Sequence, residues 1–451
     1  MQAMLPPVAV PSQSAPYTMN ERPDNSPRAA DTSGRPVLDT KDGPEALARR
    51  MAGARGSDGR PRPFIQFVAQ NLLGGGQDHA AGLRAHLEAG RVEEALALCI
   101  ERLSPRHRDE PIRRIAFALL RRPAWRQRLM PLLRKHVVDR SLDPVPSGLF
   151  LYGRLQSGKL PGRDLTSPLV WAYAIVWLLD HCEPEEVRPM ARHIADMFPK
   201  ITFLNDVANG LEQVPPRLEQ DKFHDHWTAD VELARSADPH CRRLLVCFTG
   251  MFGRMGTPIG TFHRWASRTE AHVLYLKDLR RNFYRSGVVS LTREGHDPCE
   301  DLHVFLRCLA DALGVERTGI YGISMGGIPA VEAGLAIGAD RVVWAAGAIE
   351  REDRALPYDD PSEVARRKRT GEALLARITA ASKVPEIACV FGKDFPNDAE
   401  MPLVLSAHPQ VALHPLEGLS DHNIDFHLVK AGRFDRLVGW AACNGGPLEL
   451  N

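Results

Sequence analysis

The stretch GIYGISMGGIPA, residues 319–330, places Ser324 between Gly322 and Gly326 at the end of a short apolar run. The residues before the serine predict a β-strand and those after it predict a helix, so Ser324 falls on the turn between them. Such a turn strains the serine and exposes its hydroxyl, and it needs glycines because side chains would clash where strand and helix pack closely. Ser324 is therefore a candidate nucleophile, and the alternative is a small residue in a loop.

The residues that follow Ser324 fit the same hypothesis. The backbone N–H of Met325 would point toward a developing oxyanion, aided by the positive end of the next helix. Pro329 falls near the first turn of that helix, where a missing N–H costs little.

Short β-branched runs alternate with helical patterns after residue 230. This alternation predicts βαβ units, and hence an α/β fold with a mostly parallel sheet flanked by helices. The expected strands are residues 244–248, 272–276, 318–321, 341–344, 387–391 and 411–415, with helices at 301–313 and 361–380. A further strand near residues 226–233 is expected to pair at the edge of the sheet.

A serine hydroxyl needs a histidine to take its proton and a carboxylate to orient that histidine. Asp394 and Asp398 follow the expected strand at 387–391, and His422 follows the next one, which gives the order Ser, acid, His. Both groups leave the carboxyl ends of their strands, where ligands of open parallel sheets bind. Asp394 is preferred because it lies closer to its strand, and Asp398 is the alternative acid.

Other reactive residue types compete for these roles. His414 lies inside an expected strand and His427 on a helix-like run, so His422 is preferred as the base. Cys247 and Cys389 lie within expected strands and are interpreted as core residues.

With these residues in place, residues 244 to about 440 resemble the α/β-hydrolase superfamily, over somewhat less than half of the chain. The resemblance implies Ser324 as nucleophile, Asp394 as acid, His422 as general base and Met325 as one oxyanion donor.

The second oxyanion donor of that family comes from the loop after an earlier strand. Here the segment CFTGMFGRMG implies the N–H of Met251, with Phe252 next. The chain departs from many members of the family by carrying Thr249-Gly250 where they carry His-Gly. The resemblance also places any cap over the site in residues 350–385, where the sequence predicts one clear helix.

A basic cluster, RRNFYR at residues 280–285, follows the expected strand at 272–276. Most such runs are solvated surface, while arginines at the carboxyl edge of a sheet could also hold a carboxylate or phosphate of a substrate.

The N-terminal half has a different character. Residues 1–62 are rich in Pro, Ser, Gly, Asp and Arg, which predicts a disordered tail. Residues 63–230 show helical periodicity and predict an all-helical domain; the hydrolase-like domain is assigned to 231–451. Around Gly90 a helical hairpin resembles a single tetratricopeptide-type unit, without a second copy at a fixed period. Further helices are expected at residues 110–120, 125–138, 169–181 and 185–197. This domain is either a packing unit or a site for a protein partner.

Charge and composition exclude several classes of function. The 57 lysines and arginines nearly balance 56 acids, so neither nucleic acid nor an anionic membrane is an expected partner. The eight cysteines contain no Cys-x-x-Cys pair and are expected to be reduced thiols. The first residues lack the pattern of a Sec signal peptide, and the longest apolar stretch, residues 169–179, is too short to span a bilayer. A cytoplasmic protein is expected.

Together these features predict a serine hydrolase that cleaves an ester or thioester through an acyl-enzyme, without a metal or organic cofactor. Acyl transfer to an alcohol or amine would use the same residues. The contrasting hypothesis is a non-catalytic hydrolase-like domain within a helical scaffold or interaction protein.

Overall fold

The fold was obtained as a computed structural model. The structure describes residues 79–103, 110–138, 144–158, 168–179, 182–218, 224–226, 228, 230–251, 253–347, 360–420 and 422–450. The tail predicted at residues 1–62, the second choice of oxyanion donor, Phe252, and part of the predicted cap segment lie outside the described residues.

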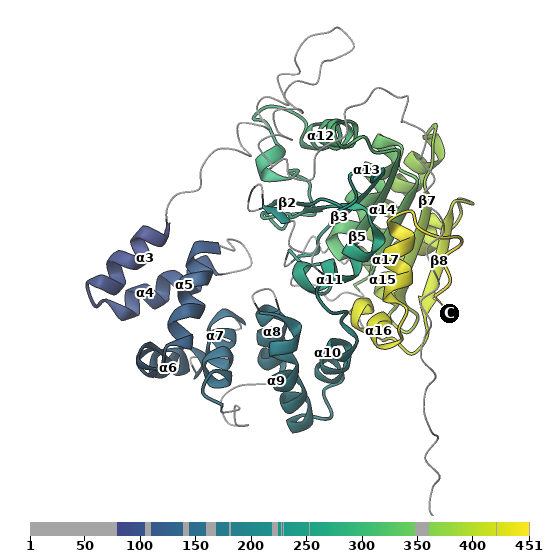
Figure 1. The fold of residues 1–451 in the computed structure, drawn as a ribbon. Coiled ribbons are helices and arrows are strands. Elements are labelled where there is room, and N and C mark those ends of the chain that lie inside the picture. Colours follow the sequence, from purple (N-terminus) through teal and green to yellow (C-terminus); the bar gives the residue numbers. More distant parts are fainter. Residues whose placement is uncertain are drawn as a thin grey trace, which may run out of the picture. The chain divides into compact units, whose positions relative to one another are not determined.

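Consecutive helices occupy the N-terminal half of the described chain (Figure 1). Their bounds are α3 (His79–Glu88), α4 (Val92–Arg102), α5 (Glu110–Arg121), α6 (Pro123–Val138), α7 (Pro144–Leu155), α8 (Pro168–Leu178), α9 (Pro184–Met197) and α10 (Thr202–Gln213). The predicted hairpin is formed by α3 and α4, and Gly90 takes the turn with a φ of 71°. No helix in the described ranges is both long and apolar enough to cross a bilayer.

Two of these helices, α7 and α10, were not predicted. The sequence of α7, PVPSGLFLYGRL, contains two prolines and two glycines, which are poor helix formers. Packing explains it, because a Cβ on Gly148 would overlap the ring of Trp177 on α8. Close approach of the two helices therefore outweighs weak intrinsic propensity.

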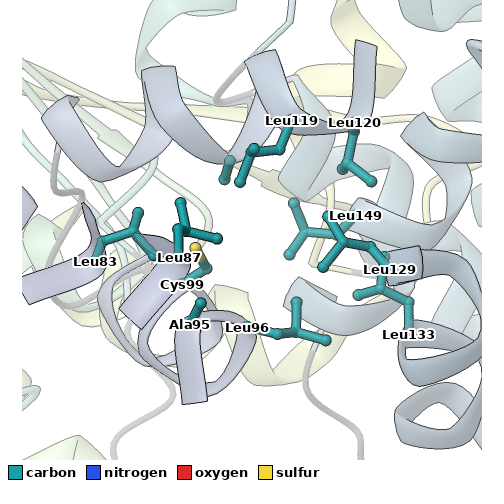
Figure 2. Close-up of a pocket in the computed structure, with 11 residues that line it drawn as sticks. Leu83, Leu87, Ala95, Leu96, Cys99, Leu119, Leu120, Leu129, Leu133 and Leu149 are labelled. Carbon is teal, nitrogen blue, oxygen red and sulfur yellow. The ribbon is translucent and has the colours of Figure 1, made fainter. Parts of the chain in front are cut away.

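A small, partly open apolar cavity lies among helices α3 to α7. Figure 2 shows its leucine lining, which includes Leu83, Leu96, Leu120, Leu133 and Leu149. An apolar cavity of this kind offers no hydrogen-bond partner to a water molecule and favours apolar groups.

The sheet of the described chain has eight strands in the order β1-β2-β4-β3-β5-β6-β7-β8. Their bounds are β1 (His224–His226), β2 (Val231–Ala234), β3 (Arg243–Phe248), β4 (His272–Leu276), β5 (Arg317–Ile323), β6 (Arg341–Ala345), β7 (Glu386–Gly392) and β8 (Val411–Leu416). The pairs β1–β2 and β2–β4 are antiparallel and all others are parallel. The predicted fold class, a mostly parallel sheet flanked by helices, is confirmed.

The edge of the sheet differs from the prediction of one strand near residues 226–233. Two antiparallel strands, β1 and β2, stand there instead. Asp230 lies in the intervening turn, where the Thr228 hydroxyl donates to its carboxylate at 2.6 Å. Short polar side chains of this kind favour turns over strands. The sheet thus begins before residue 231, where the second domain was expected to start.

Strand residues alternate between two helical layers. One face packs against α11 (Ile259–Ala266), α16 (Ile424–Lys430) and α17 (Phe434–Ala441). The other packs against α12 (Pro298–Leu313), α13 (Gly327–Ile337), α14 (Pro361–Ala380) and α15 (Pro396–Leu405). Parallel strands buried on both faces account for the nearly continuous apolar runs in the sequence.

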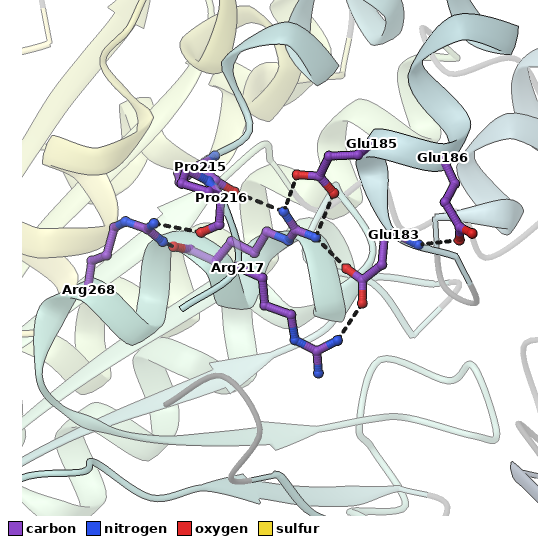
Figure 3. A network of polar contacts seen from close by, with 8 residues as sticks. Glu183, Glu185, Glu186, Pro215, Pro216, Arg217 and Arg268 are labelled. Carbon is purple, nitrogen blue, oxygen red and sulfur yellow. Dashed lines mark hydrogen bonds and ion pairs between the residues drawn. The ribbon is translucent and has the colours of Figure 1, made fainter. Parts of the chain in front are cut away.

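The helical half and the sheet half are joined by a polar network around Arg264 on α11. The Arg264 side chain, 3% exposed, donates to the carboxylates of Glu183 and Glu185 and to the Pro215 carbonyl. The solvent-exposed Arg217 also pairs with Glu183 (Figure 3). Burial raises the pKa of Glu185, but the hydrogen bond from Arg264 and backbone hydrogen bonding outweigh it, and the net shift is downward. Arg264 therefore connects three segments, whereas Arg217 makes one exposed contact.

Arg264→Ala is expected to lower the free energy of unfolding by about 2 kcal/mol, because a buried guanidinium with three partners is removed. Arg217→Ala is the matched control and is expected to cost less than about 0.5 kcal/mol, as an exposed ion pair does. Urea unfolding of the two variants measures both values. Equal losses would show that the network around Arg264 adds nothing beyond a surface ion pair.

Candidate active site

Ser324 stands on the tight turn between β5 and α13. Its φ of 52° is in the left-handed region, which is costly for a residue with a Cβ. A short 3-10 turn, Ser324–Gly326, leads directly into α13. A Cβ on Gly322 would overlap the carbonyl oxygen of Gly326, and a Cβ on Gly326 would overlap that of Phe248. The glycines are thus required by backbone packing, and the strained serine is half-buried at the carboxyl end of β5.

His422 lies between Ser324 and a carboxylate. Its Nε2 is 2.8 Å from Ser324 Oγ, and its Nδ1 is 2.9 and 2.8 Å from the two oxygens of Asp398. The Asp398 side chain is 0% exposed and that of His422 is 31% exposed. With Nδ1–H donating to Asp398, Nε2 is the acceptor for the serine hydroxyl. The three side chains have the order and contacts of a Ser-His-Asp triad.

The acid beside His422 is Asp398, the alternative, and the preference for Asp394 is corrected accordingly. Asp394 is exposed, and its backbone N–H donates to the Leu419 carbonyl at 3.1 Å. The reason is helix geometry: α15 begins at Pro396, so Asp398 lies in its first turn and projects inward. The backbone of Asp398 also packs so closely on Gly347, just after β6, that a Cβ there would overlap it. Proximity to the strand end did not determine which carboxylate points to the histidine.

Of the two residues expected to hold an oxyanion, Met325 is adjacent to Ser324 and Met251 belongs to the loop after β3. Met325 follows it in the 3-10 turn and is buried. A Cβ built on Gly250, in the loop after β3, would be 3.6 Å from the Cβ of Ser324. The Gly250 N–H donates to the Arg254 carbonyl at 2.8 Å, which leaves it engaged within its own loop. Met251 is the next residue after Gly250 and is half-buried. It is therefore one residue away from the point where this loop approaches Ser324.

The basic cluster at residues 280–285 forms a compact turn around Asp278. The carboxylate of Asp278 accepts the backbone N–H groups of Arg280, Asn282 and Tyr284. Arg280 and Arg285 are exposed. The Tyr284 hydroxyl donates to the Leu276 carbonyl at 2.7 Å, and burial, the largest cause, raises the pKa of Tyr284 far above its usual range. Exposure of the two arginines supports the solvated-surface interpretation.

The two strand cysteines are buried, as predicted. Burial raises the pKa of the Cys389 thiol to about 12 and that of Cys247 well above its ordinary value. Neither therefore forms the thiolate that a cysteine nucleophile requires. All eight cysteines carry free thiols.

One acidic residue near Ser324 and His422 was not predicted from the sequence. Asp425, in the first turn of α16, is fully buried and accepts a hydrogen bond from the Tyr321 hydroxyl at 2.9 Å. Its position one helical turn after His422 in HNIDF was the available signal, but an acid at a helix start is ordinarily an exposed cap.

The C-terminal half thus has the α/β-hydrolase type of fold, with a strained serine on the turn after β5. No family model matches the chain, and no curated protein matches it. Among solved structures, the apoenzyme of the S-formylglutathione hydrolase FrmB from Staphylococcus aureus is similar at 16% identity and a TM-score of 0.34, over 47% of this chain and 89% of that one.

Two further solved structures are similar over the same part of the chain. Brefeldin A esterase, described as a bacterial homologue of human hormone sensitive lipase, has 14% identity and a TM-score of 0.31, over 47% of this chain and 72% of that one. Esterase Est22 has 13% identity and a TM-score of 0.33, over 48% and 75%. At such values the likeness carries no argument about activity, which has to come from the site.

Proposed function

We propose that this protein is a serine hydrolase that cleaves an ester or thioester through an acyl-enzyme intermediate. The observation that carries the proposal is the continuous contact from Ser324 Oγ through His422 to the buried Asp398. The left-handed backbone at Ser324 adds support, because non-glycine residues with strained backbone cluster at functional sites.

In the proposed reaction, His422 Nε2 takes the hydroxyl proton as Ser324 Oγ attacks the carbonyl carbon. Asp398 stabilises the imidazolium that forms, and the N–H groups of Met325 and Met251 hold the oxyanion. The leaving group departs with the proton from His422. Water then attacks the acyl-enzyme and gives its proton to His422, which passes it to Ser324 Oγ as the bond between the acyl group and Ser324 breaks and the acid is released.

The cheapest test is covalent labelling with a fluorophosphonate, which reacts with activated serines. Wild type is expected to be labelled, Ser324→Ala not at all, and His422→Ala much more slowly. His414→Ala is the matched control, because that histidine lies on β8. Absence of labelling in folded wild type would overturn the proposal and favour a non-catalytic domain.

We also propose that the helical and sheet halves divide a few residues before residue 230. The helices end at Gln213 and the sheet begins at His224, which supports a division between these two residues.

A further inference from the structure

Asp425 is a buried carboxyl for which the proposed reaction has no task. It is 1% exposed and lies three residues after His422. Its Oδ1 accepts the Tyr321 hydroxyl, whereas Oδ2, although buried, has no hydrogen-bond partner within the described ranges. A buried carboxyl oxygen without a partner costs stability. The cost calls for a reason in the surroundings of the group.

Asp425 contacts two other segments that carry residues of the candidate site. Tyr321 belongs to β5, three residues before Ser324. Gly256 belongs to the loop after β3 that also carries Met251, and a Cβ on it would overlap Asp425 Oδ2. Its φ of 74° lies in the left-handed region, which favours glycine at this position. His422 directly precedes α16, the helix that carries Asp425. The Asp425 carboxyl therefore links the segment of His422 to β5, which ends at Ser324, and to the loop after β3, here called the oxyanion loop.

The titratable groups on the segments around Asp425 indicate which of them affect its protonation. Burial, the largest cause, raises the pKa of Asp425 to about 7, while the Tyr321 hydrogen bond and the charge of His422 act in the opposite direction. Lys430, at the far end of α16, pairs with Asp206 on α10, and on α11 His263 is bonded to the Tyr275 hydroxyl.

Two arginines on neighbouring segments complete this environment. Arg433, just before α17, donates to the Leu450 carbonyl, and the buried Arg254 lies in the same loop as Gly256. Of the neighbouring titratable groups, Tyr321 and His422 are those that act on Asp425.

The geometry points to Asp425 as a positioning residue of the triad. Its carboxyl holds the His422 segment against β5 and the oxyanion loop, and its negative charge favours the imidazolium that His422 becomes on taking the Ser324 proton. Asp425 itself neither gives nor takes that proton. This inference rests on the proposed hydrolase activity.

The test is the pH dependence of Asp425→Asn, which keeps the shape of the side chain and removes its charge. With p-nitrophenyl acetate, the ratio of wild-type to variant kcat/KM is expected to be about tenfold near pH 8, where the carboxyl is ionised, and within about twofold near pH 5.5, where it is protonated. KM should change little. A purely structural role would lower kcat/KM by one factor at every pH.

Tyr321→Phe is the matched control, because it removes the hydrogen bond to Asp425 and keeps the charge. Because that hydrogen bond lowers the pKa of Asp425, its loss moves the ionisation of the carboxyl to higher pH. The kcat/KM of Tyr321→Phe is therefore expected to fall below that of wild type near neutral pH and to approach it again at higher pH, where the charge is restored. A ratio for Asp425→Asn that is constant with pH would overturn the inference and leave the hydrolase standing. Wild-type hydrolysis that persists in Ser324→Ala would overturn both.

Urea unfolding tests the buried carboxyl independently of activity. The folded pKa of about 7 is above the ordinary value of 3.8, so the unfolded chain ionises first as the pH rises. Protonation of Asp425 therefore makes its full contribution to the stability of the folded state below pH 3.8, and this contribution is lost by about pH 7. The urea midpoint of Asp425→Asn should therefore equal that of wild type near about pH 4 and exceed it near about pH 8. Equal midpoints at both pH values would contradict a buried, costly charge at Asp425.

Discussion

Asp398→Asn is expected to lower kcat/KM by about 10³- to 10⁴-fold, while Asp394→Asn leaves it within about threefold. The amide keeps the size of the Asp398 side chain, but its NH₂ group cannot accept the Nδ1 proton of His422. The other tautomer is then favoured, and Nε2 carries a proton where it has to accept one from Ser324. Removal of the charge also leaves the imidazolium unsupported.

The two variants form a matched pair, because both acids follow β7 and differ in exposure. Aryl ester hydrolysis measures the effect on kcat/KM, and circular dichroism checks that both variants fold. If Asp394→Asn caused the large loss and Asp398→Asn the small one, the contact between Asp398 and His422 would have no role in catalysis.

Gly322→Ala is expected to destabilise the protein by about 3 kcal/mol and to abolish fluorophosphonate labelling. The added methyl group would overlap the Gly326 carbonyl and would lie 2.5 Å from the Cβ of Ala330. Backbone atoms cannot yield as a flexible side chain can, so β5 and α13 would have to separate. That movement displaces Ser324, which lies between the two elements.

Gly439→Ala is the control for this substitution. Gly439 lies within α17, and no atom is within 4 Å of a Cβ built there. The substitution is expected to raise the free energy of unfolding by about 0.5 kcal/mol, because alanine favours helix more than glycine does. Thermal unfolding of both variants gives the comparison. Similar stability of the two variants would show that the turn at Ser324 tolerates a side chain at Gly322.

The sequence predicted those features that depend on the order of residues along the chain. The strand-turn-helix at Ser324 and the position of His422 after β8 follow from local patterns and chain order. The choice between Asp394 and Asp398 depends instead on where α15 begins. Asp398 is the third residue of α15, whereas Asp394 precedes the helix, and no local pattern records the side-chain direction that follows from the start of this helix.

Tertiary packing accounts for the other differences. Helix α7 forms despite its prolines and glycines because Gly148 admits the ring of Trp177. Asp425 resembles an ordinary acid at a helix start, and only the contacts with Tyr321 and Gly256 reveal that it is buried. Interactions between residues distant in sequence decide such features, and these are invisible to periodicity.

The contact between α10 and α16 bears on how the protein can be divided for experiments. Gly210 on α10 lies against the ring of Phe426 on α16, and the same helices are tied by Lys430 and Asp206. A fragment that began after residue 218 would expose this apolar surface to solvent and would be prone to aggregation. Since α16 begins just after His422, the loss would also loosen the support behind this histidine, so the proposed activity is expected to be lower in an excised sheet domain than in the intact chain.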